Sequence, residues 1–190
     1  VGYQSSPAVV DGLVYVGCRD AHVYALDAAT GRKRWDYPTS KSWVIGTPAV
    51  RNGTVYVGTS DSARFMALDA KTGRLLFNYD AKAYVFSSAA IAGELVYFGN
   101  HAGRLHAIHA KTGEAAWQFQ TDGAKADPLK VAAGDGSLRP EAFAPLFNDF
   151  EDMYIDFYRY ASVGAIMSSP VVDGGVLYFG SMDGNVYALR

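Results

Sequence analysis

Hydrophobic and polar positions alternate in short runs along most of the chain, and glycine, aspartate and asparagine separate the runs. Residues 13–16 and 23–26 are two such runs, rich in valine and tyrosine, and the residues between them are mostly small or polar. Short apolar runs bounded by turn-forming residues are typical of antiparallel strands joined by hairpins. The pattern therefore predicts an all-β fold over residues 5–120 and 168–190.

One segment of sequence occurs four times. Its first copy, SPAVVDGLVYVG, begins at Ser6 and contains Tyr15. The same tyrosine recurs at Tyr56 and Tyr97, each 41 residues after the one before. The fourth copy has Tyr178, which follows Tyr97 only after 81 residues. Three contiguous repeat units are therefore followed by about one repeat length of different sequence, and then by a fourth unit.

Each complete unit predicts four short antiparallel strands. A sheet of this size cannot bury both of its faces alone, so neighbouring units must stack, as the blades of a β-propeller do. The expected fold is an all-β propeller segment of four four-stranded blades, some of them incomplete, with a helical insertion between the third and fourth. The expected boundaries are 5–45, 46–86 and 87–120 for the first three blades, 121–165 for the insertion and 166–190 for an incomplete fourth blade.

The turn and outgoing strand of the unit carry a family resemblance. The pattern Ala-x-Asp-Ala-x-Thr-Gly-x-x-x-Trp, from Ala25 to Trp35, resembles the repeat of quinoprotein-type, or PQQ-like, β-propellers. That family includes pyrroloquinoline-quinone (PQQ) alcohol dehydrogenases and the non-enzymatic propeller lipoprotein of outer-membrane barrel assembly. The resemblance implies that the Trp docks onto the neighbouring blade and that the Thr-Gly turn supports it. The residues expected in these roles are Trp35, Phe77, Trp117, Gly31, Gly73 and Gly113, with Phe77 keeping the bulk of a Trp without its N–H.

The number of units leaves the closure of the ring open. Propellers of this family usually have about eight blades, which at about 41 residues each require more than about 300 residues. The sequence supplies four units, and the fourth stops before its Thr-Gly turn. Three arrangements are compatible with this: a segment of a longer propeller, a homodimer that completes an eight-bladed ring, or a four-bladed ring. The absence of an initial Met and the abrupt end favour the first.

Residues 140–160 within the insertion have helical periodicity. Aromatic residues spaced by 4, 3, 4 and 3 predict one stripe along a helix, with Asp149, Asp152, Asp156 and Arg159 on its other faces. The prolines at 140 and 145 suit either one helix start or a short helix followed by a longer one. The stripe either packs on the propeller or docks a partner or ligand while the acidic side stays in water. It consists of Phe143, Phe147, Phe150, Tyr154 and Phe157.

Charge and composition argue against several classes of function. The 17 Lys and Arg residues are balanced by 19 Asp and Glu residues and interspersed with them, so no basic footprint for nucleic acid is present. The sequence contains no run of about 18 apolar residues, so no membrane span is predicted. His106 and His109 lie three apart on a strand and its turn and face opposite sides, which disfavours a shared metal. The acidic residues of 149–156 lack EF-hand spacing. No metal site is predicted.

Catalysis has no candidate residues in this sequence. No Ser–His–Asp set, glycine-rich phosphate loop or catalytic carboxylate pair is recognisable. The resemblance implies that a PQQ dehydrogenase stacks its quinone between a Trp and a vicinal disulfide, with Ca²⁺ beside it, and the single Cys18 cannot form that disulfide. No cofactor is therefore expected.

The expected function is that of a non-catalytic binding or scaffold propeller for a protein or small ligand, acting through its loops and the 121–165 insertion. The family's usual secretion implies a periplasmic or extracellular location. Two alternatives remain open. One is part of a PQQ- and calcium-dependent dehydrogenase, and the other is the extracellular sensor domain of a membrane receptor or kinase.

Overall fold

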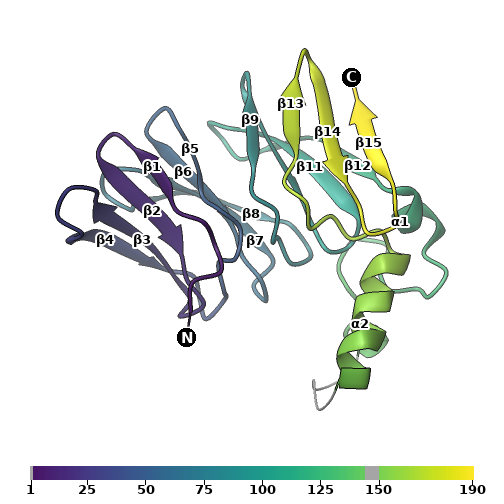
Figure 1. Ribbon diagram of the computed structural model, residues 1–190. Coiled ribbons are helices and arrows are strands. Elements are labelled where there is room, and N and C mark those ends of the chain that lie inside the picture. Colours follow the sequence, from purple (N-terminus) through teal and green to yellow (C-terminus); the bar gives the residue numbers. More distant parts are fainter. Residues whose placement is uncertain (1, 144–149) are drawn as a thin grey trace.

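The computed structural model describes residues 2–143 and 150–190, which form four antiparallel sheets in sequence order (Figure 1). The first sheet contains β1 (Ala8–Val10), β2 (Leu13–Gly17), β3 (His22–Asp27) and β4 (Lys33–Pro38). The second contains β5 (Ala49–Arg51), β6 (Thr54–Gly58), β7 (Arg64–Asp69) and β8 (Leu75–Asp80). The third contains β9 (Ala90–Ala92), β10 (Leu95–Gly99), β11 (Arg104–His109) and β12 (Ala115–Gln120). The fourth has three strands, β13 (Val171–Asp173), β14 (Val176–Gly180) and β15 (Val186–Leu189).

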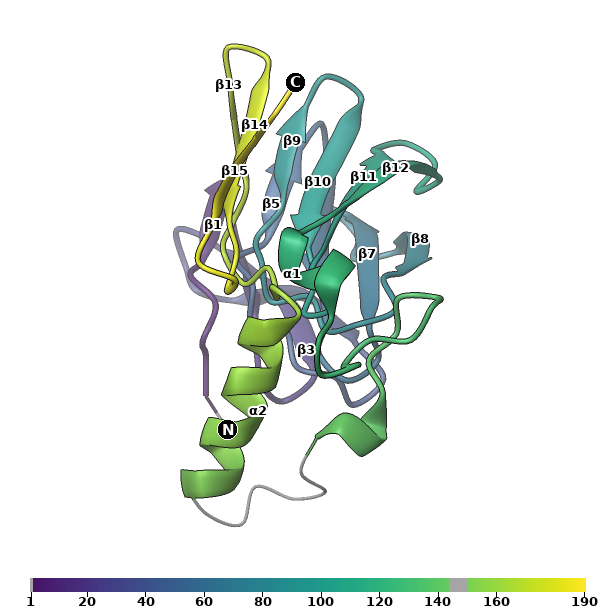
Figure 2. The ribbon, with the colours of Figure 1, turned by 90° about the vertical axis from the view of Figure 1, so that its right-hand side faces the viewer.

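Among the described residues, three helical segments lie between the third sheet and the fourth. They are α1 (Asp122–Ala126), the 3₁₀ helix η1 (Pro140–Ala142) and α2 (Phe150–Ser162). In both views α2 extends away from the sheets, at the end of the molecule where the N-terminus also lies (Figures 1 and 2). The predicted fold class is confirmed: the chain is mainly β, its sheets repeat one topology, and its helical insertion lies between the third and fourth of them.

The sheets share one register. In the first sheet Tyr15 lies opposite Ala25, and Ala25 lies opposite Trp35. The same alignment recurs as Tyr56, Ala67 and Phe77, and again as Tyr97, Ala107 and Trp117. In the fourth sheet Tyr178 lies opposite Ala188. Directly opposed residues point to the same face of a sheet, so each unit places its tyrosine and its outer aromatic ring on one side.

Buried apolar side chains fill the three spaces between successive sheets. Val23 and Ala25 of the first sheet pack against Val55 and Leu68 of the second, and all four have no exposed surface. Equivalent clusters lie between the second and third sheets and between the third and fourth. The first and fourth sheets lie at opposite ends of an open fan (Figure 1). The four-bladed ring that the sequence left open therefore does not form in this structure.

A glycine at the end of the second strand of each complete unit makes room for the segment that crosses to the next sheet. A Cβ atom on Gly58 would lie 2.6 Å from the Cβ atom of Val85, and Gly17 has the same relation to Val44. In the third unit the crossing residue is Ile166, which approaches Gly99 in the same way. The crossing segment is therefore preserved at Ile166 although the insertion precedes it.

Candidate functional site

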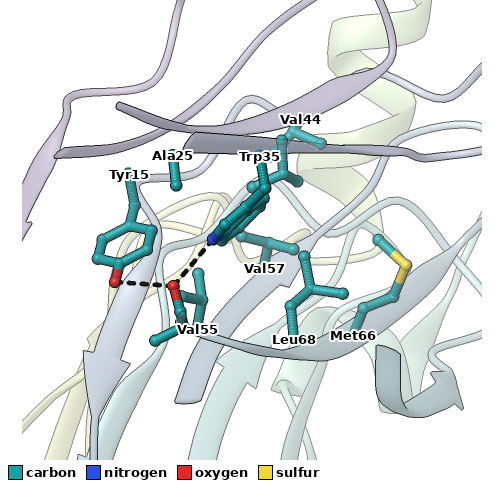
Figure 3. Close-up of a cluster of buried hydrophobic side chains, with 10 residues drawn as sticks. Tyr15, Ala25, Trp35, Val44, Val55, Val57, Met66 and Leu68 are labelled. Carbon is teal, nitrogen blue, oxygen red and sulfur yellow. Dashed lines mark hydrogen bonds between the residues drawn. The ribbon is translucent and has the colours of Figure 1, made fainter. Parts of the chain in front are cut away.

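Trp35 lies at the boundary between the first and second sheets. Its indole Nε1 donates a hydrogen bond of 2.9 Å to the carbonyl oxygen of Ala70, and the hydroxyl of Tyr15 donates one of 3.1 Å to the same oxygen (Figure 3). A Cβ atom on Gly73 would lie 2.8 Å from the indole ring, so the ring requires a glycine in that turn. Trp35 is only 8% exposed. The turn of one sheet thus covers the outer aromatic ring of the sheet before it.

Phe77 occupies the equivalent place between the second and third sheets. The hydroxyl of Tyr56 donates a hydrogen bond of 3.0 Å to the carbonyl oxygen of Ala110. A Cβ atom on Gly113 would clash with the ring of Phe77. Because phenylalanine has no N–H, this boundary has one hydrogen bond to the turn where the first boundary has two.

The remaining residues of this predicted set have no such contact. Trp117 is 39% exposed, and in the described part of the chain no turn lies over its ring. Gly31 has a positive φ of 69°, but no atom lies within 4 Å of the position its Cβ would occupy. Gly31 lies on the first sheet, which no described sheet precedes, and Trp117 faces the fourth sheet, in which no fourth strand or Thr-Gly turn is described.

The turn itself is held by its aspartate. Asp27 Oδ1 accepts hydrogen bonds from the hydroxyl of Thr30 at 2.7 Å and from the backbone N–H of Thr30 at 2.9 Å. The Arg34 guanidinium donates to Asp27 Oδ2 at 2.8 Å. The hydrogen bond from the Thr30 hydroxyl, followed by that from Arg34, lowers the pKa of Asp27 to about 2. The repeat therefore encodes its own turn geometry through short-range bonds.

The two ends of the insertion are joined to each other through Thr121. Thr121 Oγ1 accepts from the backbone N–H of Ala124 and so caps α1. The same hydroxyl lies 3.3 Å from the carbonyl oxygens of Val163 and Gly164, both of which accept from it. Residues 122–163 therefore form a closed excursion from the connection between the third and fourth sheets.

The orientation of α2 corrects, at Asp156, the expectation that the acidic residues of the helix face water. Asp156 is only 3% exposed, whereas Tyr154 is 64% exposed and Phe157 is 59% exposed. The Arg159 guanidinium donates to Asp156 Oδ1 at 3.4 Å. The buried side of the helix thus includes a charged, hydrogen-bonded residue, and the rings of Tyr154 and Phe157 are in solvent.

The buried side of α2 packs on residues of the propeller. The ring of Tyr160 meets that of His101 edge to face, with centroids 5.0 Å apart. His101 Nδ1 lies 3.0 Å from the carbonyl oxygen of Tyr84, and so donates to it. Burial, together with the negative charges of Asp61 and Asp156, raises the pKa of Tyr84. These contacts explain which side of α2 is buried.

The predicted stripe is also interrupted in the structure. Phe143 ends η1 instead of continuing α2, and its ring lies 4.8 Å from that of Tyr160. Of the two arrangements that the sequence left open, the short helix followed by a longer one is therefore the one found. Phe147 lies outside the described residues. Phe150 begins α2.

A shallow cleft of about 470 Å³ lies beside the exposed side of α2. Two of its lining residues, Ile155 and Tyr158, belong to no predicted stripe, because the periodic pattern selected only one line of aromatic positions. Glu141 and Arg159 supply its charged groups, and Leu129, Ala142 and Tyr154 complete its lining.

The described residues give no sign of a metal centre. Within 2–143 and 150–190, no group of three or more His, Cys, Asp or Glu side chains is arranged to hold an ion. In the same ranges, no helix has both the length and the apolar character that crossing a membrane requires. Cys18 is buried and is a free thiol.

Repeated four-stranded antiparallel sheets, stacked face to face through aromatic residues and turns, define a β-propeller segment. Residues 2–140 match the family model described as outer membrane protein assembly factor BamB. The chain belongs to this family of PQQ-like propellers, as the repeat pattern predicted.

Known relatives include both a kinase and oxidoreductases. The serine/threonine-protein kinase AfsK of Streptomyces griseus is 32% identical over 145 residues, covering 70% of this chain and 18% of the kinase. The quinohemoprotein alcohol dehydrogenase ADH-IIG of Pseudomonas putida is 35% identical over 161 residues, covering 74% of this chain and 21% of the enzyme. The chain thus spans about a fifth of the length of these relatives.

Solved structures share the fold. BamB from Moraxella catarrhalis superposes with a TM-score of 0.68 at 20% identity, over 98% of this chain and 46% of BamB. The computationally designed Ika4 protein superposes with a TM-score of 0.65 at 15% identity, over 99% of this chain and 90% of Ika4. At these identities the likeness concerns the fold alone.

Proposed function

We propose that this chain is a non-catalytic binding or scaffold segment of a PQQ-like propeller, and that it docks a protein partner on α2. The observation that supports the proposal is the exposed side of that helix, here called the α2 aromatic face. Its members are 49% to 64% exposed, and they are Met153, Tyr154, Phe157 and Tyr158.

The α2 aromatic face has the composition of a protein interface. Tyrosine, phenylalanine and methionine are enriched at such interfaces, and contiguous exposed apolar patches mark interaction sites. Burial of apolar surface contributes roughly 25 cal/mol per Å², so the aromatic rings supply substantial affinity when covered. The edge-to-face contact of Tyr160 with His101 holds one side of α2 on the propeller, so the opposite face is presented without reorganisation.

The charged residues beside this face indicate which chemistry a partner surface should have. Glu141 and Glu151 are exposed at its border, and Arg159 is half-buried. A partner surface with apolar side chains and a neighbouring lysine or arginine fits both the rings and the carboxylates. We infer a protein segment of that chemistry, in a periplasmic or extracellular setting such as the family's.

The insertion can be removed without changing the spacing of the sheets. Thr39 and Val44 in the first unit are joined through Ser40 and Lys41, followed by two further residues. Replacing 122–163 by Ser-Lys joins Thr121 to Ile166 with the same number of residues. This deletion variant is expected to fold and to lose its partner.

Point variants provide the sharper test. Tyr154→Ser with Phe157→Ser removes the α2 aromatic face, and Leu76→Ser removes an exposed apolar side chain from β8 as the matched control. In affinity capture from source cells, followed by titration of the purified partner, we expect binding to fall at least tenfold in the double variant only. Undiminished binding by the double variant and by the deletion would contradict the proposal.

The relatives suggest two further candidate functions. The match to the AfsK kinase supports a sensor domain, in which the α2 aromatic face would contact a neighbouring domain or receptor. The match to quinohemoprotein dehydrogenases supports part of an oxidoreductase instead. Addition of PQQ with Ca²⁺ separates them: we expect no change in quinone absorbance and none in Tm, and a saturable change in both would favour the dehydrogenase.

We further infer that more repeat units complete the ring, either as the remainder of a longer propeller or as a second copy. The open fan and its coverage of 46% of BamB support this inference. Sedimentation of the 20.5 kDa chain distinguishes a monomeric segment from a dimer of about twice that mass.

A further inference from the structure

A cation in the third sheet lacks the carboxylate that its counterpart in the second sheet has. In the second sheet Arg64 lies opposite Asp80, and Arg64 Nη1 is 3.8 Å from Asp80 Oδ2. In the third sheet the same two positions hold Arg104 and Gln120. The side-chain amide oxygen of Gln120, turned towards the guanidinium, accepts from Arg104 Nη2 at 3.0 Å and from Nη1 at 3.3 Å. The third unit thus keeps the positive charge of this pair and replaces the negative charge by a neutral amide.

The insertion builds a cleft of about 260 Å³ over this guanidinium. Arg104 and Gln120 line the cleft from the third sheet, where the insertion leaves β12 and begins α1 (Figure 2). Lys125 lines it from α1, and residues 132–134 line it from the loop that follows. A Cβ atom on Gly136 would lie 2.5 Å from Arg104 Nε, so this loop passes directly against the guanidinium. The loop and Gln120 therefore hold the half-buried Arg104 in place.

The other charged groups of the cleft already have partners. Lys125 Nζ pairs with Asp122 Oδ1 at 3.0 Å. Asp127 Oδ1 and Oδ2 each accept a backbone N–H of the loop, at 2.8 Å and 3.0 Å, so this carboxylate is used to fold the loop. Among residues 2–143 and 150–190, the Arg104 guanidinium takes part in no ion pair. Its charge is therefore available to a ligand that enters the cleft.

The chemistry of the cleft favours a single carboxylate as its ligand. A guanidinium binds both oxygens of a carboxylate through parallel N–H donors, and Arg64 already faces a carboxylate at the equivalent position. The negative charge of Asp127 in the lining disfavours a doubly charged anion such as phosphate. Ligand pockets usually measure roughly 300–1,000 Å³, so a cleft of about 260 Å³ fits a small group and not a large molecule.

We propose that this cleft, here called the Arg104 cleft, is a binding site for a carboxylate, supplied by a small organic acid or by the C-terminus of a peptide. The Arg104 guanidinium binds the carboxylate oxygens, and Lys125 adds a second positive charge to the lining. The ligand thereby supplies in the third unit the negative charge that Asp80 supplies in the second. The Arg104 cleft shares no residue with the α2 aromatic face and does not depend on the proposed function.

The first test compares ligands that differ only in this negative charge. N-acetylalanine and its neutral amide are titrated into the whole chain at constant ionic strength. Nuclear magnetic resonance follows the Nε–H signal of Arg104 and the backbone amides of residues 132–134. We expect saturable shifts with the acid, none with the amide, and binding of inorganic phosphate that is at least tenfold weaker than that of the acid.

A longer pair of ligands separates the two sources of the carboxylate. N-acetyl-trialanine with a free C-terminus and its amidated form are titrated in the same way. Binding of the longer acid that is at least tenfold tighter than that of N-acetylalanine identifies a peptide terminus as the ligand. Equal binding of the two acids identifies a small organic acid.

Variants of the chain test whether the guanidinium is responsible. Arg104→Gln should weaken binding of N-acetylalanine at least tenfold. Gln120→Glu keeps the size of the side chain and places a carboxylate on the guanidinium, so it should weaken binding at least tenfold without lowering Tm. Arg64→Gln removes the equivalent cation from the second sheet and is the matched control, with binding unchanged. Circular dichroism and Tm verify that each variant is folded.

Four results would overturn the proposal. They are equal binding of N-acetylalanine and its amide, tighter binding of phosphate than of the acid, undiminished binding by Gln120→Glu, and shifts that grow with anion concentration without saturating. Tyr154→Ser on α2, measured in parallel, should bind the acid normally. Failure of the Arg104 cleft is therefore distinguishable from failure of the proposed partner surface.

Discussion

Aromatic residues of the repeated sheets are buried, whereas those of α2 are exposed to solvent. In the sheets, Tyr15 and Trp35 are buried and their polar atoms share one carbonyl of the next sheet. In α2, Tyr154 and Phe157 are in solvent and the buried position is Asp156. A repeat supplies its own neighbour, so its apolar face is covered wherever another unit follows. An insertion has no such neighbour, and its buried side depends on which groups the propeller offers.

The largest expected effect is the loss of a buried aromatic side chain between two sheets. Trp35→Ala leaves a cavity between two sheets and removes a hydrogen bond, and should lower the free energy of unfolding by about 3–5 kcal/mol. Trp117→Ala removes the same side chain from a half-covered position and should cost about 1 kcal/mol. Urea denaturation measures both. Equal losses would mean that the turn over Trp35 contributes nothing to stability.

Acidification provides the next test, through two histidines buried by the fold. Burial lowers the pKa of His101 to about 4 and that of His106 to about 3, from 6.5. His106 Nε2 accepts from the amide of Asn100, which a protonated ring cannot do. Between these lowered pKa values and 6.5, the unfolded chain binds more protons than the folded chain. The free energy of unfolding therefore has its full value above about pH 6.5 and decreases as the pH falls towards 4.

The expected loss is on the order of 2–3 kcal/mol for each histidine at pH 4. Denaturation curves from pH 7 to pH 4 measure it. Removal of the insertion should expose His101 and reduce its share of the pH dependence. A flat stability profile over this interval would show that both rings are accessible to solvent.

A smaller effect tests the buried side of α2. Asp156→Ala removes the acceptor of the Arg159 guanidinium from an interior position, and should lower stability by about 1–3 kcal/mol. Hydrogen exchange of the α2 amides should accelerate with it, because this i,i+3 pair stabilises the helix itself. Unchanged exchange in Asp156→Ala would show that the pair contributes nothing to the stability of α2.

The smallest effect belongs to the exposed side of the same helix. Tyr154→Ser should change the free energy of unfolding by no more than about 0.5 kcal/mol, since the ring is already in water. Thermal unfolding of this variant beside Asp156→Ala measures the contrast directly. If the serine variant is the more damaging of the two, the orientation of α2 is the reverse of that described.

The sheets were predictable because each unit repeats short-range signals. The spacing of Tyr15, Tyr56 and Tyr97 predicted the units, and the fold class and family are confirmed. The contacts of Gly73 with Trp35 and of Gly113 with Phe77 follow the resemblance, while Gly31 and Trp117 have no counterpart contact. The blade boundaries and the binding role stay predictions.

The insertion was less predictable because periodicity identifies a stripe but not what covers it. The spacing from Phe143 to Phe157 correctly indicated helix at its C-terminal end and wrongly joined Phe143 to it. The i,i+3 spacing of Asp156 and Arg159 allows them to pair, but no local signal shows that Asp156 is buried while the aromatic rings are exposed. The cleft residues Ile155 and Tyr158 were missed for the same reason.

The amino-acid sequence alone determined the repeat, its strands, the Asp–Thr turns and the aromatic residue that each unit presents to the next. These features depend on contacts within one unit or between identical units, so they are written in every copy. Only the tertiary structure decided that the sheets form an open fan, which rings are covered, and which side of α2 is buried. Those outcomes depend on contacts between residues that are far apart in the chain, and sequence periodicity does not identify such contacts.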